Sequence, residues 1–185
     1  KQEAEIWLGY CGSLSASYDL KCVIDALYSL RSQCIVIPKL IVMGDGDSRE
    51  EFESYALKKQ IDCIFTGRLQ YDQMCALLKQ CDMVINPIKS NSAASIINKH
   101  GDYAASGLPV INTQDSKEYR NLIDSYKMGL NCRNGNAKDV AEKIRYLLEN
   151  QYERKNMGKN ARKCAEEKFD RKHTYREIIK TIENL

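Results

Sequence analysis

Asp102 and Lys99 are the residues of this chain whose types and spacing point most directly to chemistry. They lie in the stretch 98–113, which reads NKHGDYAASGLPVINT. This pattern predicts a short helix that is closed by Gly107 and followed by a buried strand. A helix-borne carboxylate in a nucleotide site commonly accepts hydrogen bonds from ribose hydroxyls, and such a charge-assisted bond contributes about 1.5 to 3 kcal/mol. Asp102 suits that role.

Glycine and small polar residues also follow the first and third expected strands, where ligands bind in open α/β sheets. The first loop contains Gly12 and Ser13. Its glycine permits close backbone approach and its serine can donate to an anion, although a tight turn between a strand and a helix explains the pattern equally well. The third loop contains Gly67 and Arg68. The arginine either meets a phosphate or lies unpaired on the surface.

Two further loops complete the set of candidate ligand contacts. The loop 44–48 begins at Gly44 and carries acidic residues, which the N-terminus of the next helix explains without any ligand. The loop 89–97 contains Ser95 and leads into the helix of the first motif. Small residues ahead of a helix N-terminus leave amide donors free to face a diphosphate. A polar surface loop is the alternative interpretation.

Apolar runs typical of buried strands alternate along the chain with segments of helical period. Strands spaced by helices form βαβ units, so we predict an α/β fold with a Rossmann-like, doubly wound parallel sheet of about six strands and helices on both faces. From residue 151 onward the pattern predicts a helical C-terminal tail. The expected strands are 6–10, 40–43, 63–66, 83–88, 110–112 and 129–132, and the helical segments before the tail are 20–30, 52–56, 74–78, 98–106 and 140–148. Asn136 and Asp139 form a plausible cap before the last of these helices.

The composition is that of a globular protein and argues against several other classes of protein. The 185 residues fit one ordinary domain with an appended element, and no apolar run approaches the roughly 18 residues of a membrane span. Residues 1–5 are polar and lack an apolar signal region. A net charge of +3 is too small to indicate a nucleic-acid partner. The eight cysteines are scattered, so we expect reduced thiols in a cytoplasmic protein and no metal site.

Six segments in order resemble the C-terminal, donor-binding domain of GT-B fold glycosyltransferases of the retaining family 4, or group 1 type. The resemblance covers nearly the whole chain, and the order and spacing of the segments make it specific although each segment alone is not. The matching segments are GSL at 12–14, LIVMGDG at 40–46, IFTGRL at 64–69, CDMVINP at 81–87, the stretch 99–111, and MGKNAR at 157–162 together with Phe169.

The resemblance implies a nucleotide-sugar donor, retention of anomeric configuration, no cofactor and no metal. It implies a nucleotide-sugar-binding domain at 1–150 and C-terminal helices at 151–185 that pack on the sheet or on a missing N-terminal acceptor domain. No catalytic residue is assigned. The residues expected to bind the donor nucleotide and its diphosphate are Gly12, Ser13, Gly44, Gly67, Arg68, Ser95, Lys99 and Asp102.

The resemblance further implies transfer of a sugar to a glycan or lipid-linked acceptor, in polysaccharide biosynthesis. The full-length enzyme is then expected in the cytoplasm, with peripheral contact at the inner face of the membrane. A fragment without the acceptor domain is expected to bind nucleotide and to show little or no sugar transfer.

Two departures from the family pattern leave alternatives open. The family commonly places two glutamates eight positions apart, where this chain has Ala94 and Asp102. It also commonly places an arginine or lysine in the first loop, where this chain has Ser13 and Ser17. A degenerate, non-catalytic domain that binds nucleotide or a partner protein is therefore one alternative. An enzyme similar to the nucleotide-sugar 2-epimerases is the other.

The missing cation needs a substitute if a diphosphate is to be buried, because buried phosphate charge requires cationic or amide partners. Lys99, Arg68 and Lys89 are the candidates.

Overall fold

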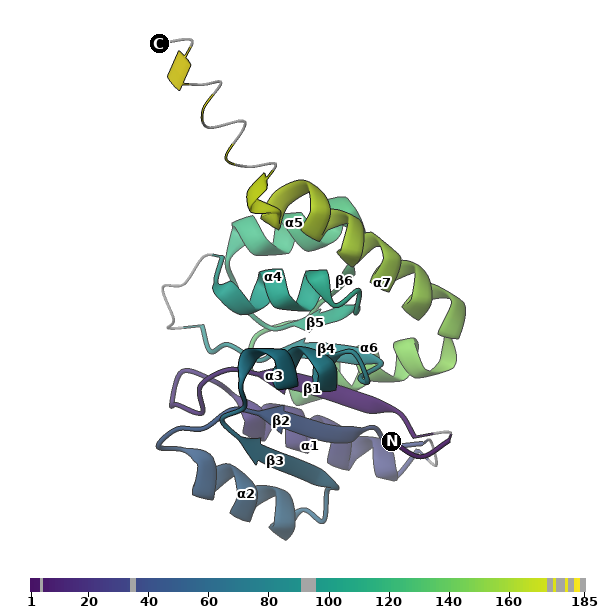
Figure 1. Ribbon diagram of the computed structural model, residues 1–185. Coiled ribbons are helices and arrows are strands. Elements are labelled where there is room, and N and C mark those ends of the chain that lie inside the picture. Colours follow the sequence, from purple (N-terminus) through teal and green to yellow (C-terminus); the bar gives the residue numbers. More distant parts are fainter. Residues whose placement is uncertain are drawn as a thin grey trace.

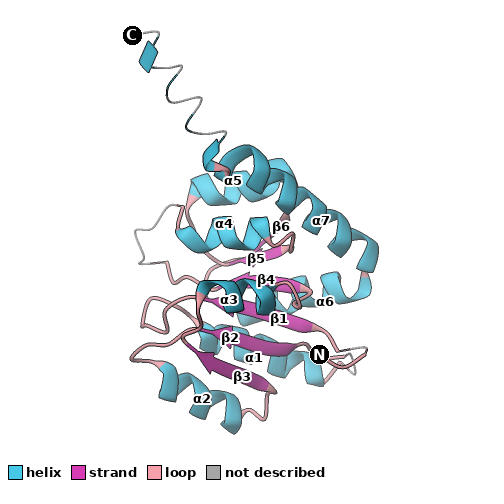
Figure 2. Cartoon of the chain, in the orientation of Figure 1, coloured by secondary structure: helices cyan, strands magenta, loops and turns pink. Residues whose placement is uncertain are grey.

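The computed structural model describes residues 1–3, 5–33, 36–90, 96–172, 175, 179, 182 and 183. They form three layers, with a parallel sheet between two layers of helices (Figures 1 and 2). The six-stranded sheet has the order β3-β2-β1-β4-β5-β6. Its strands are β1 (Trp7–Cys11), β2 (Lys39–Met43), β3 (Cys63–Gly67), β4 (Met83–Asn86), β5 (Val110–Asn112) and β6 (Gly129–Asn131). The predicted doubly wound α/β fold is confirmed.

The helices divide between the two faces of the sheet (Figure 1). On one face α1 contacts α2 and α6, and on the other α4 and α5 contact α7. The helices are α1 (Leu20–Arg31), α2 (Arg49–Lys58), α3 (Tyr71–Leu78), α4 (Asn98–Ala105), α5 (Lys117–Tyr126), α6 (Ala137–Glu149) and α7 (Gln151–Cys164), which continues into one π-helical turn, η1 (Ala165–Phe169).

Alternating side chains of the central strands supply both hydrophobic cores. In β1, Leu8 and Tyr10 join the core beneath α1 and α6, whereas Trp7 and Cys11 join the core beneath the opposite helices. Successive strand residues point to opposite faces, and both faces here are covered, so every residue of β1 is buried. This explains why the central strands are mainly apolar.

Most predicted strand boundaries are correct to one residue, but β4 is shorter than expected. It ends at Asn86 instead of residue 88. Pro87 has no amide hydrogen and cannot extend the ladder. Beyond it, Ile88 forms only an isolated antiparallel bridge with Tyr18 in the loop after β1. This bridge holds the two loops together beside the site described below.

Helix α5 is absent from the sequence prediction. The hydroxyl of Ser116 caps it by accepting the amide hydrogen of Tyr119, and Tyr119 and Ile123 are buried. Buried residues four positions apart are typical of a helix with one apolar face. The serine cap and this spacing were the available signals, in a segment whose other positions are polar.

Helix α7 and the turn η1 confirm the predicted helical C-terminal segment, as far as the structure describes it. Helix α7 passes close to the end of α4. A Cβ added at Gly158 would collide with the carbonyl oxygen of Gly107, which follows α4, so this close approach requires a glycine. The proposed division at residue 150 stays a prediction. None of the described helices has both the length and the apolar character that crossing a membrane would require.

The sheet opens where its strand order reverses, between β1 and β4. These strands pair only at Leu8 with Met83 and at Gly9 with Val84. Further along, the hydroxyl of Tyr103 accepts the Cys11 amide hydrogen at 3.0 Å and donates to the Ile85 carbonyl at 3.0 Å.

Tyr103 therefore replaces ladder hydrogen bonds that the diverging strands cannot make, and it fixes α4 over the opening. Such a topological switch point is where open α/β sheets bind ligands.

Candidate functional site

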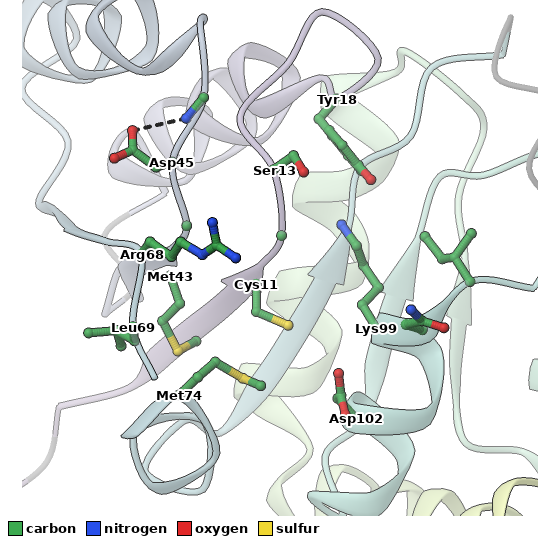
Figure 3. A pocket seen from close by; sticks show the side chains of 15 residues that line it. Cys11, Ser13, Tyr18, Met43, Asp45, Arg68, Leu69, Met74, Lys99 and Asp102 are labelled. Atoms are coloured by element: carbon green, nitrogen blue, oxygen red, sulfur yellow. Dashed lines mark hydrogen bonds between the residues drawn. The ribbon is translucent and has the colours of Figure 1, made fainter. Parts of the chain in front are cut away.

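A cavity of about 810 Å³ lies at this switch point. The ends of β1, β2 and β3, the start of α4 and part of α3 supply its walls (Figure 3). Of the residues predicted to bind a ligand, the structure places Gly12, Ser13, Gly44, Arg68, Lys99 and Asp102 on the cavity wall. Gly67 ends β3 and is not among the lining residues. Ser95 and Ala94 lie outside the described residues, so their predicted roles stay predictions.

Backbone hydrogen bonds join the loops after β1 and β2 along one wall. The amide of Gly12 donates to the carbonyl of Met43 at 3.0 Å, and the amide of Leu14 donates to that of Asp45 at 2.9 Å. Gly44 has φ +157°, and a Cβ there would collide with the Gly12 carbonyl. The glycine is therefore required by the contact between the loops, whether or not a ligand binds.

Lys99 is the least expected feature of the cavity, because its side chain is buried and none of the described residues pairs with its amino group. The residue is 7% exposed, and its Nζ has no hydrogen-bond partner within the described part of the chain. Nζ lies 3.9 Å from the ring centre of Tyr18 and 4.4 Å from that of Tyr10. Burial lowers the pKa of Lys99 to about 7. Among the described residues, the cavity thus contains a lysine amino group without a hydrogen-bond acceptor.

The two tyrosines around Lys99 are themselves fixed. Their rings meet edge to face, with centres 5.7 Å apart. The hydroxyl of Tyr10 donates to the carbonyl of Ser13 at 2.6 Å. Tyr ring faces attract an ammonium group electrostatically, so they stabilise its charged form while burial opposes it. The loop after β1 and the position of Lys99 are consequently coupled.

Asp102 lies one turn after Lys99 on α4 and is half-buried. Its Oδ1 accepts a hydrogen bond from the hydroxyl of Tyr71 at 2.9 Å. Lys99 and Asp102 are three residues apart, a separation that places side chains on neighbouring parts of one helix face. One helix therefore presents a cation and a carboxylate to the same cavity, as Figure 3 shows.

Arg68 faces Lys99 across the cavity. Figure 3 shows the two side chains reaching toward the same space from opposite walls, with Cys11 between them. No hydrogen bond or ion pair that the structure describes engages the Arg68 guanidinium. Of the three candidate substitutes for the missing cation, Lys89 is the one that does not line the cavity.

His100, next to Lys99, has a structural role. Its ring stacks on Tyr119 with centres 3.4 Å apart, and its Nδ1 accepts the amide hydrogen of Ile97 at 3.2 Å. Burial, with the charge of Lys99 as a second cause, lowers the pKa of His100 to about 3. A neutral His100 thus fixes the first turn of α4, and with it the start of the Lys99 side chain.

Sequence reasoning missed Tyr10, Tyr18 and Tyr71. Each contacts a predicted site residue, but no local motif marks such a tyrosine. Its partner lies between 31 and 89 positions away in the chain. The only available signal was the presence of Tyr10 and Tyr18 on either side of the first glycine loop.

The described residues contain no group of three or more His, Cys, Asp or Glu side chains arranged to hold a metal ion. The expectation that no metal is needed stays a prediction. The cavity instead offers two cationic side chains, one carboxylate and the first turn of α4, beside an apolar wall that includes Met43, Leu69 and Met74. These groups match a ligand that combines negative charge, hydroxyl donors and a flat apolar part.

Comparison with known proteins identifies the family of the chain. The family model for glycosyl transferases group 1 matches residues 1–164. An uncharacterized glycosyltransferase of Methanocaldococcus jannaschii is 26% identical over 145 residues, which are 78% of this chain and 40% of that protein. The sulfoquinovosyl transferase SQD2 of Arabidopsis thaliana is 28% identical over 153 residues, or 82% of this chain and 27% of that protein. The chain thus spans less than half of either relative.

Solved structures show the same fold. Anabaena Alr3699/HepE in complex with UDP superimposes with a TM-score of 0.82 at 20% identity, over 98% of this chain and 49% of that one. The C-terminal domain of the group 1 glycosyl transferase LpcC from Francisella tularensis gives 0.74 at 15% identity, over 89% and 86% of the two chains. The fold is therefore that of one Rossmann-like domain of the GT-B glycosyltransferases. With the family match covering nearly its whole length, the chain belongs to the family of group 1 glycosyl transferases.

Proposed function

We propose that this chain is the donor-binding half of a retaining glycosyltransferase, and that its cavity binds a nucleotide-diphosphate sugar. The observation that carries the proposal is the buried ammonium group of Lys99, to which the described residues offer no acceptor, on the same helix as Asp102. A buried charge is costly unless it is paired, and a site that keeps one unpaired gains most from an anionic ligand.

Each side chain then has a distinct part in binding. Lys99 and Arg68, from opposite walls, neutralise the diphosphate, and the amides at the N-terminus of α4 add donors of the kind that bind phosphate. Asp102 accepts the hydroxyl hydrogens of the ribose. With two side-chain cations at the diphosphate, we propose that donor binding needs no metal.

The comparisons support a nucleotide sugar as the ligand class. A structure of similar fold contains UDP, and another of the same Anabaena protein contains UDP-glucose. The chain spans 40% or less of the two curated relatives described above. We therefore propose that a separate Rossmann-like domain supplies the acceptor site. We also propose that the acceptor is a glycan or lipid-linked glycan, in polysaccharide biosynthesis at the cytoplasmic face of a membrane.

Binding is the first test. Isothermal titration calorimetry with UDP and GDP is expected to show saturable binding of at least one of them, and the same nucleotide raises the melting temperature because it stabilises the folded state. Uridine and guanosine, which lack the diphosphate, are expected to bind far more weakly. Failure of both nucleotides to bind, at concentrations that saturate a known donor domain, would overturn the proposal.

Sugar transfer is the second test. The chain alone is expected to show little or no transfer, because the acceptor site is absent. The full-length protein is expected to give a product with the anomeric configuration of the donor, as read by NMR of the new glycosidic bond. Robust transfer by the chain alone, or a product of inverted configuration, contradicts the corresponding part of the proposal.

A second candidate, a nucleotide-binding domain without catalysis, is favoured by one observation. Ser13 occupies the cavity wall at the position where the family resemblance places a cation. The two candidates differ in the full-length protein: both bind nucleotide, and only the enzyme transfers sugar or slowly hydrolyses the donor.

A further inference from the structure

Tyr71 makes a contact that spans the opening of the sheet. It is the first residue of α3, which follows β3, and its hydroxyl donates to Oδ1 of Asp102 on α4 at 2.9 Å. Helix α3 belongs to the half of the sheet built from β1 to β3, and α4 follows β4 in the other half. This one hydrogen bond therefore ties the carboxylate on one side of the cavity to a helix on the other.

The setting of Tyr71 argues against a packing role. The residue is 67% exposed, so the ring contributes little to either core. The start of α3 is held independently, because the Gln73 side chain accepts the amide hydrogen of Gln70 at 3.3 Å. Hydrogen bonding to Asp102 raises the pKa of Tyr71, so the phenol remains a donor at neutral pH.

Among the described residues, Tyr71 is the one hydrogen-bond partner of the Asp102 carboxylate. In the part of the chain that the structure describes, no ion pair reaches it, and the Tyr71 hydroxyl is the donor that hydrogen-bonds its oxygens. A carboxylate offers about four acceptor positions, so this bond leaves room for two further hydroxyl donors. A side chain with one fixed hydrogen bond loses less rotational freedom when it binds a ligand.

We infer that Tyr71 is a positioning residue for sugar hydroxyls: it holds the Asp102 carboxylate across the cavity mouth in the orientation that accepts the vicinal hydroxyls of a ribose. The inference rests on the proposed function and adds a second residue, from another helix, to ribose recognition.

The test is the substitution Tyr71→Phe, which removes only the hydroxyl. Calorimetry compares UDP with 2′,3′-dideoxyuridine diphosphate, which keeps the base and the diphosphate but lacks both hydroxyls. Loss of one positioning hydrogen bond is expected to weaken UDP binding roughly three- to tenfold. Binding of the dideoxy compound is expected to be unchanged, because it makes no use of Asp102. The guanosine pair of compounds replaces the uridine pair if GDP is the ligand that binds.

Two further variants make the outcome specific. Tyr126→Phe removes the hydroxyl of a half-buried tyrosine that donates to Glu167 at 2.7 Å outside the cavity, and this variant is expected to bind both ligands as the unsubstituted chain does. Asp102→Ala is expected to abolish the preference for UDP over its dideoxy form. In the Asp102→Ala background, Tyr71→Phe is expected to have no additional effect, because interacting residues are not additive.

Each contrary result has a separate meaning. Equal weakening of both ligands by Tyr71→Phe, or an unchanged affinity for UDP, overturns the positioning role while the proposed function stands. If Tyr71→Phe weakens binding further in the Asp102→Ala background, Tyr71 acts on the ligand directly. That result also overturns the positioning role. Absence of any nucleotide binding by the unsubstituted chain overturns the proposed function itself.

Discussion

The ammonium nitrogen of Lys99 lies 3.9 Å from the ring centre of Tyr18, in a site where no described acceptor reaches it. The ring face stabilises the charge by about 0.5 to 2 kcal/mol, less than the cost of removing an ammonium group from water. The folded chain thus retains an unfavourable group at its cavity. Such local cost is typical of sites that bind ligands.

Lys99→Met is expected to weaken UDP binding by about ten- to a hundredfold, since a charge-assisted hydrogen bond contributes about 1.5 to 3 kcal/mol. Methionine keeps the length and apolar contacts of the stem and removes the charge. Calorimetry at about pH 6, below the lowered pKa of Lys99, measures the effect.

Lys59→Met is the matched control for this substitution. Lys59 also lies over two tyrosine rings, 4.9 Å from Tyr28 and 5.4 Å from Tyr55, but it pairs with Asp25 at 2.8 Å and does not line the cavity. Its replacement is expected to leave UDP affinity unchanged. Equal affinities of the two variants would refute the assignment of Lys99 to the diphosphate.

The contribution of Lys99 to the stability of the unliganded chain is expected to become more favourable as the pH rises from about 7 toward 10.5. Burial lowers the folded-state pKa of Lys99 from 10.5 to about 7, so between these values the unfolded chain binds a proton that the folded chain does not. Stability rises with pH wherever the unfolded state binds more protons, here by up to about 1.4 kcal/mol per pH unit. Below pH 7 both states carry the proton and the contribution is constant.

Urea unfolding of the original chain and of Lys99→Met between pH 7 and 9 isolates this contribution. The variant is expected to be more stable near pH 7, with the difference shrinking as the pH rises. Parallel stability curves for the two proteins would contradict the lowered pKa.

Gly44→Ala is expected to destabilise the fold by about 3 kcal/mol, a large overpacking effect, because the new methyl group meets the Gly12 backbone, which cannot move aside easily. Gly135→Ala is the comparison. Gly135 also has positive φ, +64°, but nothing lies within 4 Å of its added Cβ, so about 1 kcal/mol of backbone strain is expected there. Urea midpoints measure both. Similar losses would show that backbone conformation, and not the contact between loops, requires Gly44.

Much of the fold could be predicted because its signals are local. The run 40–43 is apolar throughout, as both-face burial demands, and the Asn136 side chain caps α6 as its position before the apolar pattern indicated. Helix α5 was missed because its buried face interrupts a largely polar segment. The end of β4 was misplaced because Ile88 continues the apolar run, although Pro87 cannot continue the ladder.

The candidate site was predicted as a set of loops, not as a geometry. Parallel strands bring their carboxyl ends to one edge of a sheet, so Gly12, Gly44 and Arg68 were expected to lie together, and they line one cavity. Nothing local indicated that Lys99 would be buried or that Tyr71 would bond to Asp102. Their roles in binding stay predictions until the ligand experiments are done.

The sequence by itself determined the alternation of strands and helices, the parallel sheet and the loops at its ligand-binding edge, because hydrophobic period and glycine or proline punctuation act over a few residues. Only the tertiary structure decided that Lys99 is desolvated between Tyr10 and Tyr18. Those partners lie 89 and 81 positions earlier in the chain. The free energy of a charged group, and therefore its pKa, depends on the groups that surround it in space. Packing brings those groups together from distant parts of the chain.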